Sequence, residues 1–271
     1  MTTNSISFED ETYGEIAPDI PNYLFGAPYQ SYLHFETHVE FMKVCNVIKR
    51  GYEKPMAYGF ISHNDIWGAD STAHNAALTT GLSEGYVITK AKILLDDLAP
   101  LFISLGLDPY GSDYDLCLEI CHHLIESAVD LLIKNEDPQI GEKIVSSSMR
   151  PNKVIHDLLI RAYAGDFFEN YPSETGSEEG AAAIITTAEM TFRYATLLLG
   201  EALKKNAPDD LLDLSQQLAD LAEFVYGITI EATDLASILL LAMSHCALDY
   251  LAEISATIDY VDKELKAHLF E

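Results

Sequence analysis

The chain has 271 residues, of which 48% are hydrophobic and 22% charged, and its formal net charge is -27. This composition supplies enough apolar surface for a buried core and excludes an intrinsically disordered chain. So acidic a surface repels nucleic acid and anionic lipid, which argues against nucleic acid as a partner. An anionic substrate would require bound cations that reverse the local potential.

The chain starts with "MTTNSISFEDETYG", in which no basic stretch precedes an apolar one, so a secretory signal is not expected. The most apolar run, "LASILLLAMSHCALDYLA", is interrupted by His245 and Asp249 and is too short for a transmembrane segment. The four cysteines show no CxxC spacing, which is typical of buried thiols in a reducing compartment. We therefore expect a soluble protein, in the cytoplasm rather than secreted.

Apolar residues recur at three- and four-residue intervals along most of the chain, whereas strand patterns are sparse, so the sequence predicts an all-α fold. The expected helices cover residues 30–50, 54–62, 73–105, 112–134, 138–148, 153–164, 181–205, 209–227 and 230–268. The helices over 73–105 and 230–268 are each expected to break once.

Residues 170–180, "NYPSETGSEEG", combine Pro, Gly, Ser and Glu without apolar periodicity and predict a mobile acidic loop. Because all histidines except His245 and His268 precede it, we assign any chemistry to the first part of the chain. The predicted organisation is a metal-binding helical region over 1–169, the loop, and C-terminal helices over 181–271 packed on the same domain. These last helices also offer a surface for a homo-oligomer.

Acidic and histidine side chains begin near the N-terminus. Asp19 lies between prolines in "APDIPNYL", an apolar setting in which an unpaired carboxylate is costly and a bound cation would remove that cost. Alternatively, Asp19 caps a turn. His34 and His38 follow in "HFETH", one helical turn apart.

The stretch "FISHNDIWGADSTAH" contains His63, Asp65, Asp70 and His74. Gly68 permits a tight turn that brings either Asp65 or Asp70 back beside His63. Imidazole and carboxylate together are the ligands expected for zinc in a hydrolytic site. The alternative is a capped polar loop with a solvent-facing histidine.

In "CHHLIESAVD", His122 and Glu126 are four residues apart on a predicted helix, so their side chains lie one turn apart on one face. This spacing allows both to bind one cation. The alternative is an ordinary surface pair on the helix.

The order of the motifs "APDIPNYL", "HFETH", "AYGFISH", "DSTAH" and "HHLIESAVDLL" resembles the zinc-dependent phospholipase C family. That family includes bacterial phosphatidylcholine-hydrolysing enzymes and glycosylphosphatidylinositol-specific phospholipase D. The resemblance spans residues 14–133, about half of the chain. It implies a phospholipase C-like bundle of helices around a metal cleft, extended here by the C-terminal helices.

Carried over position by position, the resemblance implies one zinc ion bound by Asp19, His34, His63 and Asp70, and a second bound by His74, His122 and Glu126. His63 and Asp70 are further apart in sequence than the corresponding family pair, so either "DIWG" forms an inserted bulge or Asp65 replaces Asp70. No histidine precedes His34 to support a third site, so we expect about two ions per chain. His38, His123 and Asp130 are expected to orient the ligands.

The activity implied by this resemblance is metal-dependent hydrolysis of a phospholipid or small phosphoester. Two cations would activate water and bind the attacking and leaving oxygens, and Asp19 or Asp65 would act as the general base.

Three alternatives remain open. The doublet His156 and Asp157 is similar to that of helical HD-type phosphohydrolases. The "EICH" pair, Glu119 and His122, is similar to half of a di-iron carboxylate site, which needs two such copies. The third alternative is a non-catalytic helical metal-binding protein.

Overall fold

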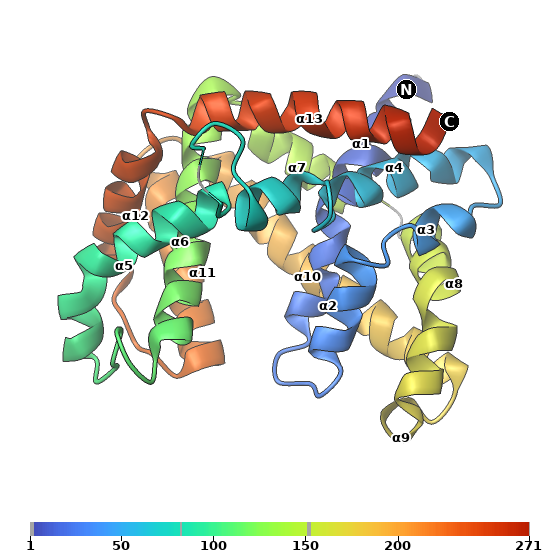
Figure 1. Cartoon of the computed structure of the whole chain (residues 1–271), viewed down its shortest axis with the longest axis horizontal. Helices are drawn as coiled ribbons and strands as arrows, with labels where there is room; N and C mark the ends of the chain where they lie inside the picture. The colour runs from blue at the N-terminus through green and yellow to red at the C-terminus, as the bar shows by residue number, and fades with distance from the viewer. Residues whose placement is uncertain (1–2, 82, 151–152, 271) are drawn as a thin grey trace. The chain divides into compact units, whose positions relative to one another are not determined.

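The computed structural model describes residues 3–81, 83–150 and 153–270 (Figure 1). These residues contain helices and no strand, which confirms the predicted all-α class. The elements are α1 (Thr3–Ile16), the 3-10 helix η1 (Ala17–Tyr23), α2 (Gln30–His38), α3 (Lys43–Asn46), the 3-10 turn η2 (Gly51–Glu53), α4 (Lys54–His63), the π-helical turn η3 (Ser71–Asn75), α5 (Tyr86–Ser104), α6 (Tyr114–Glu136), α7 (Ile140–Ser148), α8 (Lys153–Asn170), α9 (Pro172–Thr175), α10 (Glu178–Leu203), α11 (Asp209–Tyr226), α12 (Ala232–Cys246) and α13 (Tyr250–Phe270).

Several helix boundaries differ from the predicted ones. The helix predicted over 30–50 ends at His38, and the buried Phe41 that follows packs edge-on against Trp67. The helix predicted over 73–105 begins only at Tyr86. The acidic loop is shorter than predicted, because α8 extends to Asn170 and α9 lies inside the predicted loop. The predicted break in the last helix is confirmed between α12 and α13.

The described chain divides into two compact units, each assembled from separate segments. Unit 1 contains residues 1–70, 142–200 and 261–271, and unit 2 contains residues 71–141 and 201–260. Each unit therefore draws on residues from both sides of the predicted 170–180 loop.

In unit 1, α1 and α4 cross with their backbones in direct contact. A Cβ atom built on Gly14 would lie 2.3 Å from the carbonyl oxygen of Met56, and one built on Gly59 would lie 2.1 Å from that of Glu11. Only glycine fits at such a close approach. The crossing brings the end of α4, where His63 stands, alongside the end of α1.

A buried carboxylate ties α1 to two later helices of unit 1. Glu189 on α10 is fully buried and accepts hydrogen bonds from the hydroxyl of Tyr13 at 2.8 Å and from Nε of Arg193 at 2.9 Å. Its other oxygen lies 2.7 Å from Nε2 of His156 on α8. Three polar partners satisfy a group whose burial alone would be costly.

In unit 2, α5, α6, α11 and α12 lie side by side (Figure 1) and bury leucine, isoleucine and alanine side chains between them. The carboxylate of Glu253 on α13 is buried and accepts the backbone N–H groups of Leu78 at 2.6 Å and Thr79 at 2.8 Å. Those N–H groups bond to a side chain instead of a helical carbonyl, so no helix continues from η3 into α5. The loop that follows His74 is fixed by this contact.

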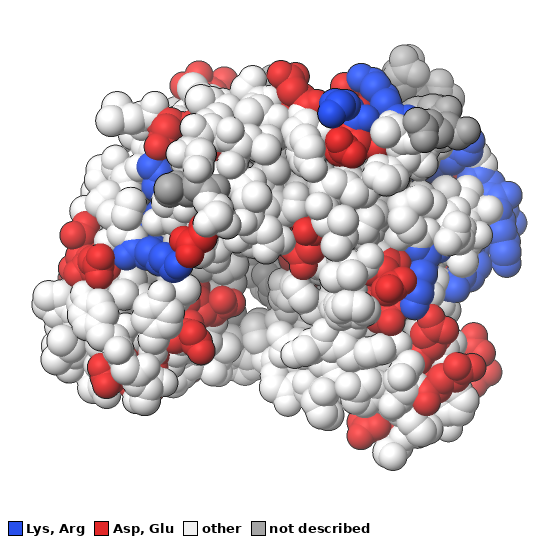
Figure 2. Space-filling view, viewed as in Figure 1, with Lys and Arg blue, Asp and Glu red and all other residues white. Residues whose placement is uncertain are grey.

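Among the described residues, no single helix combines the length and apolar composition that a membrane crossing needs. The pair α12 and α13 reaches that composition only when taken together, and the two are bent by 67° at their break. On the face drawn in Figure 2, acidic side chains occur in several separate groups, and basic side chains lie beside some of these groups.

Candidate metal centres

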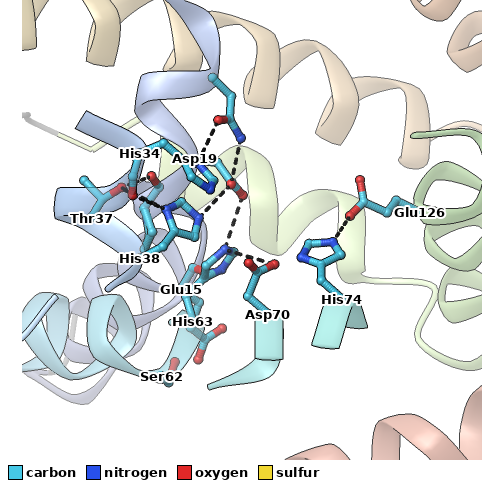
Figure 3. Close-up of polar contacts among 12 residues, drawn as sticks. Glu15, Asp19, His34, Thr37, His38, Ser62, His63, Asp70, His74 and Glu126 are labelled. Carbon is cyan, nitrogen blue, oxygen red and sulfur yellow. Dashed lines mark hydrogen bonds and ion pairs between the residues drawn. The ribbon is translucent and has the colours of Figure 1, made fainter. Parts of the chain in front are cut away.

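In unit 1, Asp19 of η1, His38 of α2 and His63 of α4 come together with Asp70, which precedes η3 (Figure 3). Nε2 of His38 lies 3.4 Å from Oδ1 of Asp19. Nε2 of His63 lies 3.6 Å from Oδ2 of Asp19 and 3.7 Å from Oδ1 of Asp70. We call these four residues the unit 1 centre.

Hydrogen bonding fixes the tautomer of His63. Its Nδ1 lies 2.7 Å from the backbone carbonyl oxygen of Glu15, which can only accept, so Nδ1 carries the proton. In the neutral ring, Nε2 then presents a lone pair to the carboxylates of Asp19 and Asp70. This buried nitrogen has no hydrogen-bond partner within the described part of the chain.

Hydrogen bonds at Nδ1 also fix the tautomer of His38, whose side chain is only 1% exposed. Its Nδ1 lies 3.0 Å from the carbonyl oxygen of His34 and 2.9 Å from the hydroxyl of Thr37. That hydroxyl donates to the carbonyl of Pro18, so it can accept from Nδ1. An N–H held by a backbone carbonyl on one side of the ring is the usual support of a metal-ligating histidine.

The spacing of these atoms distinguishes a cation site from a set of hydrogen bonds. Hydrogen bonds of this type have lengths of about 2.7–3.2 Å. Ligand atoms at zinc bond lengths in a tetrahedral site are about 3.3–3.5 Å from each other. The separations of 3.4, 3.6 and 3.7 Å are close to the second range. The two imidazole nitrogens and the carboxylate of Asp19 lie close enough together to bind one divalent cation, and Asp70 contacts His63 beside them.

His34, which the sequence assigns as a ligand, lies beside this group instead of within it. Its ring stacks on His38 with 3.8 Å between centroids, and its Nδ1 lies 3.1 Å from Oδ1 of Asn22. The amide nitrogen of Asn22 in turn donates to Oδ1 of Asp19 at 3.0 Å. Burial, together with the neighbouring His38, lowers the pKa of His34 to about 4, so this ring is neutral. The structure places His38, expected only as a supporting residue, in the group that faces Asp19 and His63.

A tight turn brings Asp70 back to His63. The side-chain oxygen of Asn64 accepts the N–H groups of Ile66 at 2.8 Å and Trp67 at 2.9 Å. Gly68 follows, where a Cβ atom would lie 2.4 Å from the carbonyl of His63. Of the two arrangements left open by the sequence, the structure shows the inserted bulge, with Asp70 next to His63. Asp65 donates its backbone N–H to the carbonyl of His38 at 3.0 Å.

In unit 2, the three residues predicted for the second ion face one another. Nε2 of His122 on α6 lies 3.0 Å from Nε2 of His74 and 2.8 Å from Oε1 of Glu126. Both are hydrogen-bond distances, so these side chains would have to move apart by a few tenths of an ångström to bind a cation between them. Nε2 of His74 lies 3.5 Å from Oε1 of Glu126, and Figure 3 shows the contact between His74 and Glu126. We call this group the unit 2 centre.

In the unit 2 centre, the carboxylate of Glu126 and the ring of His122 each stabilise the charged form of the other. Burial opposes ionisation of Glu126, but contacts with His122, His123 and His74 hold the pKa of its carboxyl group well below the usual range. Burial also opposes protonation of His122, yet Glu119 and Glu126 raise its pKa. A divalent cation bound here must therefore displace protons, which makes its affinity fall as the pH falls.

Other histidines named from the sequence have different partners. Asp157 pairs with Lys153 at 3.1 Å, whereas His156 faces Glu189, so the doublet does not converge on one point. His245 lies 2.8 Å from Asp97, and the ring of His268 stacks on Trp67 with 5.0 Å between centroids.

Sequence reasoning missed Asn22, Thr37 and Asn64, which orient the unit 1 ligands. Polar residues next to histidines were the only available signal, and that signal is common in any sequence. Comparison of the chain with protein-family models, with curated proteins and with solved structures finds no match.

Proposed function

We propose that this protein is a metal-dependent phosphoester hydrolase similar to the zinc-dependent phospholipases C. The observation that carries the proposal is the convergence, in each unit, of histidine nitrogens and carboxylate oxygens on a common point. The two centres are consecutive in the chain, with only three residues between Asp70 and His74.

The residues present fit a zinc ion. The buried Nε2 of His63 lacks a hydrogen-bond partner and faces two carboxylates, an arrangement that a cation stabilises and that is otherwise costly. Mixed nitrogen and oxygen ligands favour zinc over magnesium or calcium, which prefer oxygen alone. When bound, such an ion supplies Lewis acidity toward a phosphoester and toward water.

Exposure of the side chains supports a catalytic site over a purely structural one. The histidines of the unit 1 centre are largely buried, whereas the side chain of Asp19 is 35% exposed and that of Glu126 in the unit 2 centre is 42% exposed. Each centre therefore has one accessible carboxylate, that of Asp19 or that of Glu126. Structural zinc sites are closed by protein ligands, and catalytic ones keep a position open.

The chain's own groups supply the proton transfer. Asp19 is accessible, and its orientation is fixed by the amide of Asn22 and the ring of His38, so it can accept a proton from water. Asp65 is the second candidate base and is held next to His38 by its backbone N–H. Because the formal charge of the chain is -27, an anionic phosphoester approaches favourably only where cations are bound.

The first experiment is to measure metal content by mass spectrometry after zinc supplementation. We expect about two ions per chain. His63→Ala and Glu126→Ala should each lose one ion, since each removes a ligand of a different centre. His245→Ala is the matched control, because this histidine contacts Asp97 outside both centres. Zinc-supplemented protein without bound metal would refute the proposal.

The second experiment separates the hydrolase from the non-catalytic alternative. Rates of hydrolysis are compared between wild type and Asp19→Asn on choline, ethanolamine, inositol and nucleotide phosphoesters. We expect the variant to lose about a hundredfold or more, because several kcal/mol of barrier lowering depend on the site. Equal background rates in both proteins, with metal confirmed bound, would establish a non-catalytic metal-binding protein.

A further inference from the structure

One face of α6 carries a closed ring of four side chains, Glu119, His122, His123 and Glu126. Each carboxylate faces both histidines. Oε2 of Glu119 lies 3.5 Å from Nδ1 of His122, and its Oε1 lies 3.3 Å from Nε2 of His123. Oε1 of Glu126 lies 2.8 Å from Nε2 of His122, and its Oε2 lies 3.6 Å from Nδ1 of His123.

His122 is the member of this ring that faces the unit 2 centre. Its Nε2 points to His74 and Glu126, and its Nδ1 points to Glu119. A neutral imidazole carries one proton, and a carboxylate can only accept. Without a metal ion, the carboxylate of Glu126 at 2.8 Å is the nearer acceptor and favours the proton on Nε2. A metal ion bound at Nε2 would leave the proton on Nδ1, where Glu119 at 3.5 Å is the acceptor.

His123 completes the ring from the opposite side. Its two nitrogens face one oxygen of Glu119 and one of Glu126, so as an imidazolium it lies between two carboxylates. This contact holds Oε2 of Glu126 away from the centre and leaves Oε1 facing His122. The rings of His122 and His123 are stacked at 15° to one another, with 5.1 Å between centroids.

We infer that Glu119 is a positioning residue of the unit 2 centre, which favours the tautomer of His122 whose Nε2 binds the cation. This inference rests on the proposed function, in which His122 is a ligand. Carboxylate partners of ligating histidines raise the basicity of the ring and fix its orientation, and their loss weakens metal binding without removing a ligand.

The test compares Glu119→Ala, Glu119→Gln and Asp115→Ala in the full-length chain. Asp115 is the matched control, because it is an exposed acid of the same helix four residues away from Glu119 and is no part of the ring. A His63→Ala background isolates the unit 2 centre. Zinc affinity is measured by competition with a chromophoric chelator, and the geometry of the site is followed by Co²⁺ absorption.

Glu119→Ala should weaken zinc binding about 10- to 100-fold while the centre still takes up one ion. Glu119→Gln keeps an acceptor oxygen for Nδ1 and should recover most of the affinity, and Asp115→Ala should match the parent protein. If the unit 2 centre of Glu119→Ala no longer binds one zinc ion at saturation, Glu119 is itself a ligand. Unchanged affinity in that variant would mean that it has no role. Either result would overturn the inference.

A second readout does not depend on metal uptake. Nitrogen-15 NMR of the metal-free protein, at a pH where His122 is neutral, reports which ring nitrogen carries the proton. We expect a larger share of Nδ1–H in wild type and Glu119→Gln than in Glu119→Ala, in which Glu126 at Nε2 is the only remaining carboxylate partner of His122 in the ring. If wild type binds no metal, the proposed function fails, and the tautomer measurement still decides whether Glu119 orients His122. The same tautomer mixture in all three proteins would overturn the inference.

Discussion

His63 and Asp70 face each other across a tight turn, with 3.7 Å between Nε2 of the histidine and Oδ1 of the aspartate. The turn is closed by the buried side chain of Asn64, which accepts two backbone N–H groups. The unit 1 centre therefore depends on a residue that is not itself a candidate ligand.

The first prediction concerns this turn. Asn64→Ala leaves the N–H groups of Ile66 and Trp67 without their acceptor, so the free energy of unfolding should fall by about 1–3 kcal/mol. Asn64→Ser retains a weaker acceptor, so its free energy of unfolding should lie between those of wild type and Asn64→Ala. Urea denaturation measures the stability, and zinc titration should show weaker binding at the unit 1 centre alone. An alanine variant as stable as wild type would contradict the role of the turn.

The second prediction concerns the crossing of α1 and α4. In Gly59→Ala, the added Cβ would lie 2.1 Å from the carbonyl oxygen of Glu11, so the helices must separate. We expect a loss of about 1–3 kcal/mol from this overpacking. The matched control is Gly165→Ala on α8, where the new Cβ meets nothing within 4 Å. The free energy of unfolding of Gly165→Ala should be unchanged or rise by up to about 1 kcal/mol, because alanine has the higher helix propensity.

The third prediction is a pH dependence of stability in the metal-free protein. Burial opposes protonation of His123, but contacts with Glu119 and Glu126 raise its pKa from 6.5 to about 10. Because the folded-state pKa is raised, the stabilisation is fully present below pH 6.5 and is lost as the pH rises to about 10. The wild-type stability should therefore fall across this window more steeply than that of His123→Gln. Stability is measured by urea denaturation at each pH. If wild type and His123→Gln lose stability in parallel across this window, the ion pairs of His123 do not stabilise the fold.

The fourth prediction distinguishes the proposed centres from an HD-type site. His156→Ala and Asp157→Ala should both keep the wild-type metal content. His156 contacts Glu189 and Asp157 contacts Lys153, so the two side chains do not converge on one site. His156→Ala should lose stability, since it removes a partner of the fully buried Glu189. Asp157→Ala, which breaks an exposed pair, should change stability little. Loss of one ion in both variants would favour the HD-type alternative.

Two residues of the unit 2 centre, His122 and Glu126, could be placed together from the sequence because a local rule positions them, whereas His74 was assigned only by the family resemblance. His122 and Glu126 are four residues apart on one continuous helix, and this spacing alone places them on the same face. Most helices were predictable for the same reason, since their apolar periodicity is a local property. Helix ends were less predictable, because they depend on distant contacts such as that between Glu253 and Leu78.

The unit 1 centre shows where local rules are insufficient. His34 and His38 are also four residues apart on one helix, so periodicity cannot choose between them. The choice depends on where η1 and α4 place Asp19 and His63, and those positions follow from the contact of α1 with α4 and from the Asn64 turn. Both are tertiary features without a distinctive sequence pattern.

The stacking of His268 on Trp67 joins residues about 200 positions apart in the sequence within one unit. During translation the turn that contains Trp67 is made first, and the ring that stacks on it is synthesised about 200 residues later. Contacts between such distant residues close slowly, because a long loop must be ordered first. The surroundings of the unit 1 centre are therefore completed only after synthesis of α13, and metal loading of the nascent chain should lag behind the folding of its N-terminal helices.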